Sequence, residues 1–359
     1  MNVGDALVLR KENMPRFVAS LLTEMRVVAP KKHFGGDVMF AEVQSPDEIS
    51  WDYGNDPHPP KRYVLPELEP LFRYRSDGRV EIERMADAPR QAILGIRSCD
   101  VVALRQQERF FSQPIADPNF TARARNTVLL SLVCNSPREE CFCICCDAGP
   151  YLTEGYDVQL TDLGDRFLYE IGSETGLDVS SPRAALLTTA SDGDLDARRR
   201  IELEADAKFE TTGYIAKAIN FISANEVPEQ VWDDLGATCF KCGNCTHLCP
   251  VCTCFTVEDI PEKDGWYTRL RCWDSCQFAG FTREASGVNP RATFGRRVQR
   301  RLYHKASYQY ILRDSRHGCV GCGRCTKGCL ADLGLPAVVR QVRRAMHAYL
   351  RPASEHAEV

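Results

Sequence analysis

The sequence lacks the segments that would direct it into or across a membrane. Its 359 residues contain no run of about 18 uncharged apolar residues, the length that a helix needs to span a bilayer. The first residues include charges early and have no long apolar core, so we expect no secretory signal. The sequence therefore predicts a cytoplasmic protein with no membrane span.

Several catalytic and nucleotide-binding motifs are absent as well. No Gly-x-Gly-x-x-Gly follows an expected strand, and the stretch Gly318–Gly323 has the wrong spacing for one. There is no Gly-x-x-x-x-Gly-Lys-Ser/Thr for nucleotide phosphates and no Cys-x-x-Cys-His for covalent haem. No Ser-His-Asp or Cys-His arrangement is indicated by spacing. We therefore expect a chain that does not turn over a substrate by itself.

Cysteine, in contrast, is abundant, with 18 residues in the chain. Eight of them form two runs with the same Cys-x-x-Cys-x-x-Cys-x-x-x-Cys spacing, which is the bacterial ferredoxin pattern for iron–sulfur ligation. Because cytosolic thiols stay reduced, metal ligation is favoured over a disulfide framework. The first run is Cys239, Cys242, Cys245 and Cys249, and the second is Cys319, Cys322, Cys325 and Cys329.

The ligands are expected to cross between the two runs. Three cysteines on one tight loop can bind three irons of a cubane, and the fourth iron faces away from that loop. In two-cluster ferredoxins the fourth cysteine of each run therefore binds the other cluster. The sequence predicts two 4Fe–4S clusters, one held by Cys239, Cys242, Cys245 and Cys329, and the other by Cys319, Cys322, Cys325 and Cys249.

A third metal centre is a further possibility in the N-terminal half. Cys99 follows one expected strand and Cys134 ends the next, so parallel strands would bring both thiols to the same sheet edge. The loop that follows is rich in thiols. The simplest ligand set is Cys99, Cys134, Cys141 and Cys143, with Cys145 or Cys146 as substitutes. Alternatively, Cys99 and Cys134 are buried small apolar residues.

Four more cysteines and a histidine lie near the two runs. The cysteines are Cys252, Cys254, Cys272 and Cys276. They have three possible roles: ligands of another centre, ligands that shift the register of the first run, or residues that pack around the clusters. Packing is preferred, because weak S–H donors near a cluster tune its potential. His247 lies inside the first run, which already has four thiolates, so it is expected at the surface or behind the ligands.

The periodicity of apolar residues predicts an α/β N-terminal domain, residues 1–180, followed by a helical connector, 181–235. Expected strands at Ala92–Ile96 and Thr127–Val133 flank a helix, which is typical of a parallel βαβ unit. A hairpin is expected over Tyr156–Glu170. Residues 236–359 are predicted to form a mainly α-helical ferredoxin-like dicluster domain, with helical insertion Val251–Gly318 and expected helices at 296–312 and 337–350.

Charge is distributed unevenly. From Arg291 to Arg351 there are fourteen Lys or Arg residues and two acids, whereas the whole chain has a net charge of −4. These cations are expected to offset the clusters' negative charge and to form a docking face for an acidic redox partner. The candidate docking residues are Arg296, Arg297, Arg300, Arg301, Arg343 and Arg344. No nucleic-acid recognition module accompanies them, so nucleic acid is not an expected partner.

In combination these motifs resemble a family with two branches, the beta subunits of cytosolic sulfhydrogenases and the electron-transfer subunits of anaerobic sulfite reductases. The similarity extends from about Val38 to Val342. It rests on Leu94–Asp100, Arg125–Cys134, Cys141–Cys143, Thr161–Phe167, Cys242–Cys245, Cys249–Cys254, Trp273–Gln277, Arg301–Lys305 and Cys319–Cys325.

The resemblance implies an electron-transfer role within a larger complex. The chain would pass electrons between a flavin-containing, NAD(P)H-linked subunit, on one side, and a catalytic subunit, on the other, with a soluble nickel–iron hydrogenase favoured as that catalyst. The same relay could instead feed a sirohaem-type sulfite reductase. A third hypothesis, from another class, is an iron–sulfur redox-sensing or structural protein.

Overall fold

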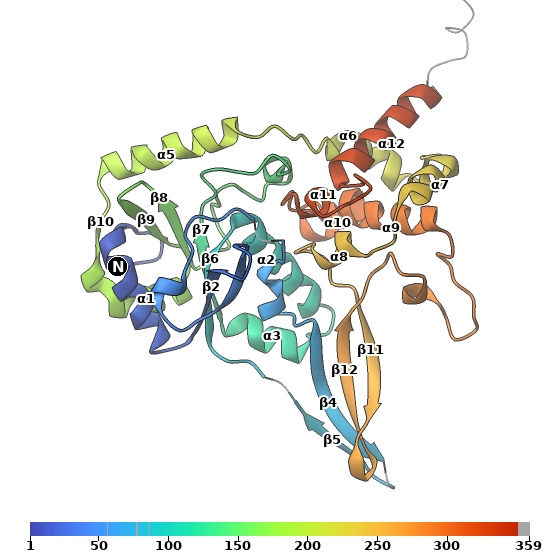
Figure 1. The fold of residues 1–359 in the computed structure, drawn as a ribbon, viewed down its shortest axis with the longest axis horizontal. Coiled ribbons are helices and arrows are strands. Elements are labelled where there is room, and N and C mark those ends of the chain that lie inside the picture. The colour runs from blue at the N-terminus through green and yellow to red at the C-terminus, as the bar shows by residue number, and fades with distance from the viewer. Residues whose placement is uncertain (56, 77, 86, 351–359) are drawn as a thin grey trace, which may run out of the picture. The chain divides into compact units, whose positions relative to one another are not determined.

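The chain forms two compact units that alternate along the sequence. The computed structural model describes residues 1–350 apart from 56, 77 and 86 (Figure 1). The first unit comprises Met1–Arg138, Ala148–Phe209 and Phe255–Trp273, and the second comprises the remaining segments. The sequence predicts domain borders near residues 180 and 235. The units interleave instead, because Glu139–Asp147 packs with the second unit and Phe255–Trp273 packs with the first.

An eight-stranded mixed sheet forms the centre of the first unit. Its strand order is β10-β1-β9-β8-β7-β6-β2-β3. The bounds are β1 (Ala6–Arg10), β2 (Arg26–Lys32), β3 (Val38–Val43), β6 (Gln91–Ile96), β7 (Thr127–Leu132), β8 (Val158–Asp162), β9 (Arg166–Ile171) and β10 (Leu187–Thr189). Strands β2, β6, β7 and β8 run parallel, whereas β8 and β9 form an antiparallel pair. The expected parallel unit and the expected hairpin are both confirmed.

Helices cover this sheet. They are α1 (Met14–Leu22), α2 (Ser98–Ser112), α3 (Pro118–Arg125), α4 (Glu174–Ser180) and α5 (Asp192–Ala207). Helix α1 inserts Phe17, Val18 and Leu21 into a buried cluster with alternate residues of the strands, as expected for a sheet with period-two side-chain alternation. Helices α2 and α3 pack against β7. Strand β6 is buried along its whole length, which is typical of a central parallel strand.

A second, four-stranded antiparallel sheet extends from the same unit as a long ribbon (Figure 1). It pairs β11 (Phe255–Pro261), β12 (Trp266–Trp273), β4 (Leu68–Ser76) and β5 (Val80–Arg84) in that order. A buried ion-pair network fixes its base. The Glu69 carboxylate is fully buried and lies 2.5 Å from Arg123 Nη1 and 2.9 Å from Arg271 Nε. Strands β11 and β12 lie in the insertion Val251–Gly318, for which the sequence predicts helices.

The described part of the second unit consists of helices and loops. The helices are α6 (Ile215–Ser223), α7 (Glu229–Thr238), α8 (Asn244–His247), α9 (Phe294–Ala306), α10 (Tyr308–Asp314), α11 (Arg324–Lys327) and α12 (Leu335–Leu350). The helix expected over 296–312 is divided at Ser307, whose extended backbone separates α9 from α10. Helices α7 and α9 approach so closely that Gly295 has no room for a side chain: a Cβ there would lie 2.9 Å from the Trp232 backbone.

Candidate iron–sulfur site

The two cysteine runs adopt the same backbone conformation. The residue before each second cysteine has a left-handed conformation, with φ of 58° at Lys241 and 61° at Gly321. This turn aims the backbone N–H of each residue at the first thiol of its run. Lys241 N donates to Cys239 Sγ at 3.4 Å, and Gly321 N donates to Cys319 Sγ at 3.4 Å. Identical spacing thus produces identical loops.

A glycine after the second cysteine turns each loop into a short helix. Gly243 and Gly323 have φ of 77° and 76°, in the region that favours glycine. They precede α8 and α11, which pack against each other. Asn244 Nδ2 also donates to the Gly328 carbonyl at 3.3 Å. These contacts hold the two runs side by side.

The eight cysteines line two cavities within the second unit. In each cavity, three cysteines of one run face the last cysteine of the other run. One cavity is lined by Cys239, Cys242, Cys245 and Cys329. The other is lined by Cys319, Cys322, Cys325 and Cys249, and Cys245 lines this cavity as well. The crossed ligand sets predicted from the sequence are therefore brought together; which thiolate binds which iron stays a prediction.

The chemistry of these thiols suits iron–sulfur clusters. Burial raises the pKa of Cys245 to about 12, and burial also raises the pKa of Cys325. A free thiolate is therefore costly at these positions, whereas iron would supply the positive charge that deprotonates a bound thiol. No three His, Cys, Asp or Glu side chains in residues 1–350, leaving out 56, 77 and 86, converge on a single-ion site. A cubane does not require this, because each cysteine binds a different iron.

Helix α9 places two buried cations against the cysteines. Lys305 Nζ donates to Cys249 Sγ at 3.4 Å. Although burial lowers the pKa of Lys305, the thiolates of Cys249 and Cys252 raise it well above its usual value. Burial likewise lowers the pKa of Arg301, but Cys245 and Cys325 raise it overall. A spacing of four residues from Arg297 to Arg301 to Lys305 puts all three on one helix face.

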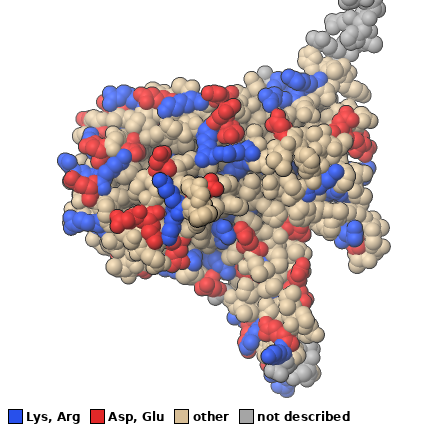
Figure 2. Space-filling view, in the orientation of Figure 1, with Lys and Arg blue, Asp and Glu red and all other residues tan. Residues whose placement is uncertain are grey.

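This burial corrects part of the predicted docking face. Arg297 and Arg301 are 2% and 5% exposed, so they cannot meet a partner. Of the other four candidates, Arg296 and Arg344 are exposed, whereas Arg300 and Arg343 are half-buried. Figure 2 shows basic and acidic side chains interleaved over the visible face, with no broad field of one sign. For the two buried arginines, offsetting cluster charge is the better explanation.

The thiol-rich loop Glu139–Asp147 packs against the second cysteine run. Phe142 N donates to the Gly321 carbonyl at 2.8 Å, and Cys141 Sγ lies 3.7 Å from the Cys322 carbonyl oxygen. The Cys146 thiol hydrogen-bonds to Cys319, which raises the pKa of Cys146. Sequence reasoning missed this contact, because no spacing rule connects the loop to a run that begins more than 170 residues later.

The candidate ligands of a third centre are divided between the two units. Cys99 is buried in the first turn of α2, and Cys134 follows β7 at the parallel sheet edge, as expected. Both thiols lie near the Tyr53 hydroxyl, and burial raises the pKa of this tyrosine. Cys141 and Cys143 belong to the second unit. The third centre therefore remains a prediction.

The four cysteines outside the runs and the Cys141–Cys146 loop that lie near the first run in sequence have different neighbours in the structure. They are Cys252, Cys254, Cys272 and Cys276. The Cys252 thiol contacts Cys249, and the Cys254 thiol contacts Cys276. Hydrogen bonding from Cys254 lowers the pKa of Cys276 to about 6. Cys272 lies in β12 of the first unit. His247 is half-buried, with its ring centroid 6.0 Å from that of Phe278.

Comparison with known proteins agrees with this geometry. A family model described as a 4Fe–4S dicluster domain matches residues 238–333, which include both runs and the insertion between them. The chain is also 28% identical to "Sulfhydrogenase 2 subunit beta" from Pyrococcus furiosus over 338 residues, covering 94% of this chain and 98% of that protein. Together the two matches confirm the predicted resemblance to the sulfhydrogenase beta-subunit family. No helix within the described residues is long and apolar enough to cross a bilayer.

Proposed function

We propose that this chain is an iron–sulfur electron-transfer subunit with two 4Fe–4S clusters. The observation that supports the proposal is the pair of cavities, each lined by three cysteines of one run and the last cysteine of the other. The thiolates would hold the clusters, which supply one-electron carriers. Arg301 and Lys305 would offset the negative charge that four thiolates and an added electron bring to each site.

The proposed partners are two further subunits. One contains flavin and is linked to NAD(P)H, and the other is catalytic, with a nickel–iron hydrogenase favoured. The name of the Pyrococcus furiosus relative supports this choice. A sulfite reductase catalytic subunit is the alternative. We place the complex in the cytoplasm, because reduced thiols are required to load the clusters.

Metal analysis of the anaerobically purified chain tests the cluster count. Two clusters require about eight irons and as much acid-labile sulfide, four of each per cluster. About twelve irons would support the additional centre at Cys99, Cys134, Cys141 and Cys143. About four irons, or zinc in place of iron, would refute the two-cluster proposal.

Gentle affinity capture from the native host identifies the partners. Co-purification of nickel with a flavoprotein supports the hydrogenase complex, and sirohaem in place of nickel supports the sulfite reductase. Clusters that exchange no electrons with any captured flavoprotein would favour the redox-sensing or structural hypothesis. Rapid-mixing reduction with NADH or NADPH provides that measurement.

A further inference from the structure

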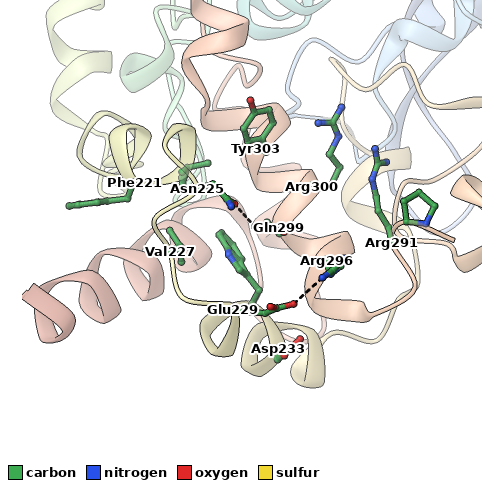
Figure 3. Close-up of a pocket in the computed structure, with 13 residues that line it drawn as sticks. Phe221, Asn225, Val227, Glu229, Asp233, Arg291, Arg296, Gln299, Arg300 and Tyr303 are labelled. Atoms are coloured by element: carbon green, nitrogen blue, oxygen red, sulfur yellow. Dashed lines mark hydrogen bonds and ion pairs between the residues drawn. The ribbon is translucent and has the colours of Figure 1, made fainter.

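The second unit contains a large pocket on the side of α9 that does not face the cysteines. The pocket has a volume of about 610 Å³ and is formed by α6, α7, α9 and the loop at Pro290–Arg291 (Figure 3). Arg296, Gln299, Arg300 and Tyr303 of α9 line it. The opposite face of the same helix presents Arg297, Arg301 and Lys305, of which the last two meet cluster cysteines. The proposed function makes no use of this cavity, which lies in the size range of small-molecule sites.

Two guanidinium groups lie at the pocket wall. Arg291 and Arg300 extend in the same direction (Figure 3). Burial and the charge of Arg300 lower the pKa of Arg291, against a smaller opposite effect from the Cys276 and Cys254 thiols. Neither forms an ion pair with any carboxylate in the described part of the chain, and Arg300 Nε is buried without a hydrogen-bond partner. Arg296 differs, because it pairs with Glu229 at 3.4 Å.

The remaining lining combines aromatic rings with polar side chains, including the carboxylates of Glu229 and Asp233, and it contains a second unsatisfied donor. Trp232 is 3% exposed, and its indole Nε1 is buried without a hydrogen-bond partner. A buried indole N–H usually finds an acceptor, so its position at a pocket suggests that a ligand supplies one. Phe221 and Tyr303 add ring surface, and the Arg300 guanidinium lies 5.5 Å from the Tyr303 ring centroid.

We propose that this pocket binds an anionic ligand of mononucleotide size that combines a phosphate with a planar ring. The paired guanidinium groups of Arg291 and Arg300 match a phosphate, which arginine binds through parallel N–H donors. The ring packs against Phe221 and Tyr303, and one of its acceptors receives the Trp232 N–H. The two guanidinium groups thus match the phosphate, the aromatic side chains match the ring, and the indole N–H matches an acceptor on that ring.

Calorimetric titration of the full-length, cluster-loaded protein tests this assignment. AMP and FMN are the probes, since they join a phosphate to planar rings of different size. Adenosine provides the ring without the charge, and inorganic phosphate provides the charge without the ring. We expect at least one of AMP and FMN to bind at least tenfold more tightly than adenosine or phosphate alone.

Matched variants assign any binding to the pocket. Arg300→Ala should weaken binding of the nucleotide at least tenfold, and Arg300→Lys, which keeps the charge but not the planar fork, should weaken it less. Trp232→Phe should weaken binding several-fold while it preserves packing. Arg344→Ala removes an exposed cation of α12 that does not line the pocket, and should leave binding unchanged.

Iron content and visible absorbance show whether each variant retains its clusters, which separates loss of the pocket from loss of the fold. Three results would overturn the proposal: no binding of AMP or FMN to the wild type, phosphate binding as tight as nucleotide binding, or nucleotide binding that Arg300→Ala does not alter. The cluster count and partner identity do not enter the measurement, so it can fail while the proposed function holds.

Discussion

Replacing Lys305 with methionine should make the reduction potential of the proposed cluster at Cys319, Cys322, Cys325 and Cys249 more negative. Lys305 is 6% exposed, and its ammonium donates to Cys249 Sγ at 3.4 Å. Reduction adds negative charge to the cluster, and a buried cation stabilises that added charge. Methionine has a similar length but no charge, so the variant removes the electrostatic contribution while it largely fills the same volume.

The size of the shift follows from Coulomb's law. A unit charge 3.4 Å from a thiolate interacts by about 5 kcal/mol at an effective dielectric constant of about 20. The added electron is spread over the whole cluster, and at roughly 8 Å from the ammonium the interaction falls to about 2 kcal/mol. For a one-electron couple this corresponds to about 90 mV.

Potentiometric titration followed by electron paramagnetic resonance measures this change. Lys327→Met is the matched control, because Lys327 lies in α11, within the second run between Cys325 and Cys329, but is exposed. Solvent and salt screen its charge, so its replacement should shift the potential little. A shift for Lys305→Met that equals the control, or one toward positive potential, would refute the assigned role of this lysine.

Three further predictions concern the ligand crossing and the stability of the first unit. Cys329→Ser should abolish the signal of the cluster held by Cys239 and its run and lower iron by about half; loss of the other cluster would contradict the crossing. Glu69→Gln should lower the free energy of unfolding by about 3 kcal/mol, because buried Arg123 loses its carboxylate and buried Arg271 keeps only that of Asp117. In chemical denaturation the control Glu83→Gln, which breaks an exposed ion pair with Arg73, should cost less than about 1 kcal/mol. Hydrogen bonding from Ser191 lowers the pKa of Asp194 from 3.8 to about 2, so its stabilising effect should be full above pH 3.8 and disappear as the pH falls through 2. Acid unfolding of the wild type beside Asp194→Asn checks this, and a difference that persists below pH 2 would contradict it.

Part of the fold could be predicted because it depends on local patterns. The continuous apolar runs at β6 and β7 predict buried parallel strands, and the structure confirms them. The hairpin of β8 and β9 follows from alternation around a short polar turn. The strands β11 and β12 were not predicted. Their alternation is weak, and β12 joins the sheet by pairing with β4, nearly 200 residues away, while β11 pairs with β12.

The two cations that the structure adds to the site, Arg301 and Lys305, also depend on tertiary packing. Arg301 and Lys305 appeared in the sequence as part of a basic segment, and their spacing could have marked one helix face. Nothing in that spacing shows whether the face is exposed. Tertiary packing decides which face is buried: Arg297, Arg301 and Lys305 are buried, whereas Arg296 is exposed to solvent.

By itself, the sequence determined the chemistry of the two runs, because a cubane requires thiols at fixed short intervals and the same intervals produce the same loop twice. Only the tertiary structure decided what surrounds them. It laid the Cys141–Cys146 loop on the second run, placed the Lys305 ammonium against Cys249, and enclosed the pocket beside α9. Those outcomes depend on contacts between segments far apart in the chain, and no local pattern of residues encodes such contacts.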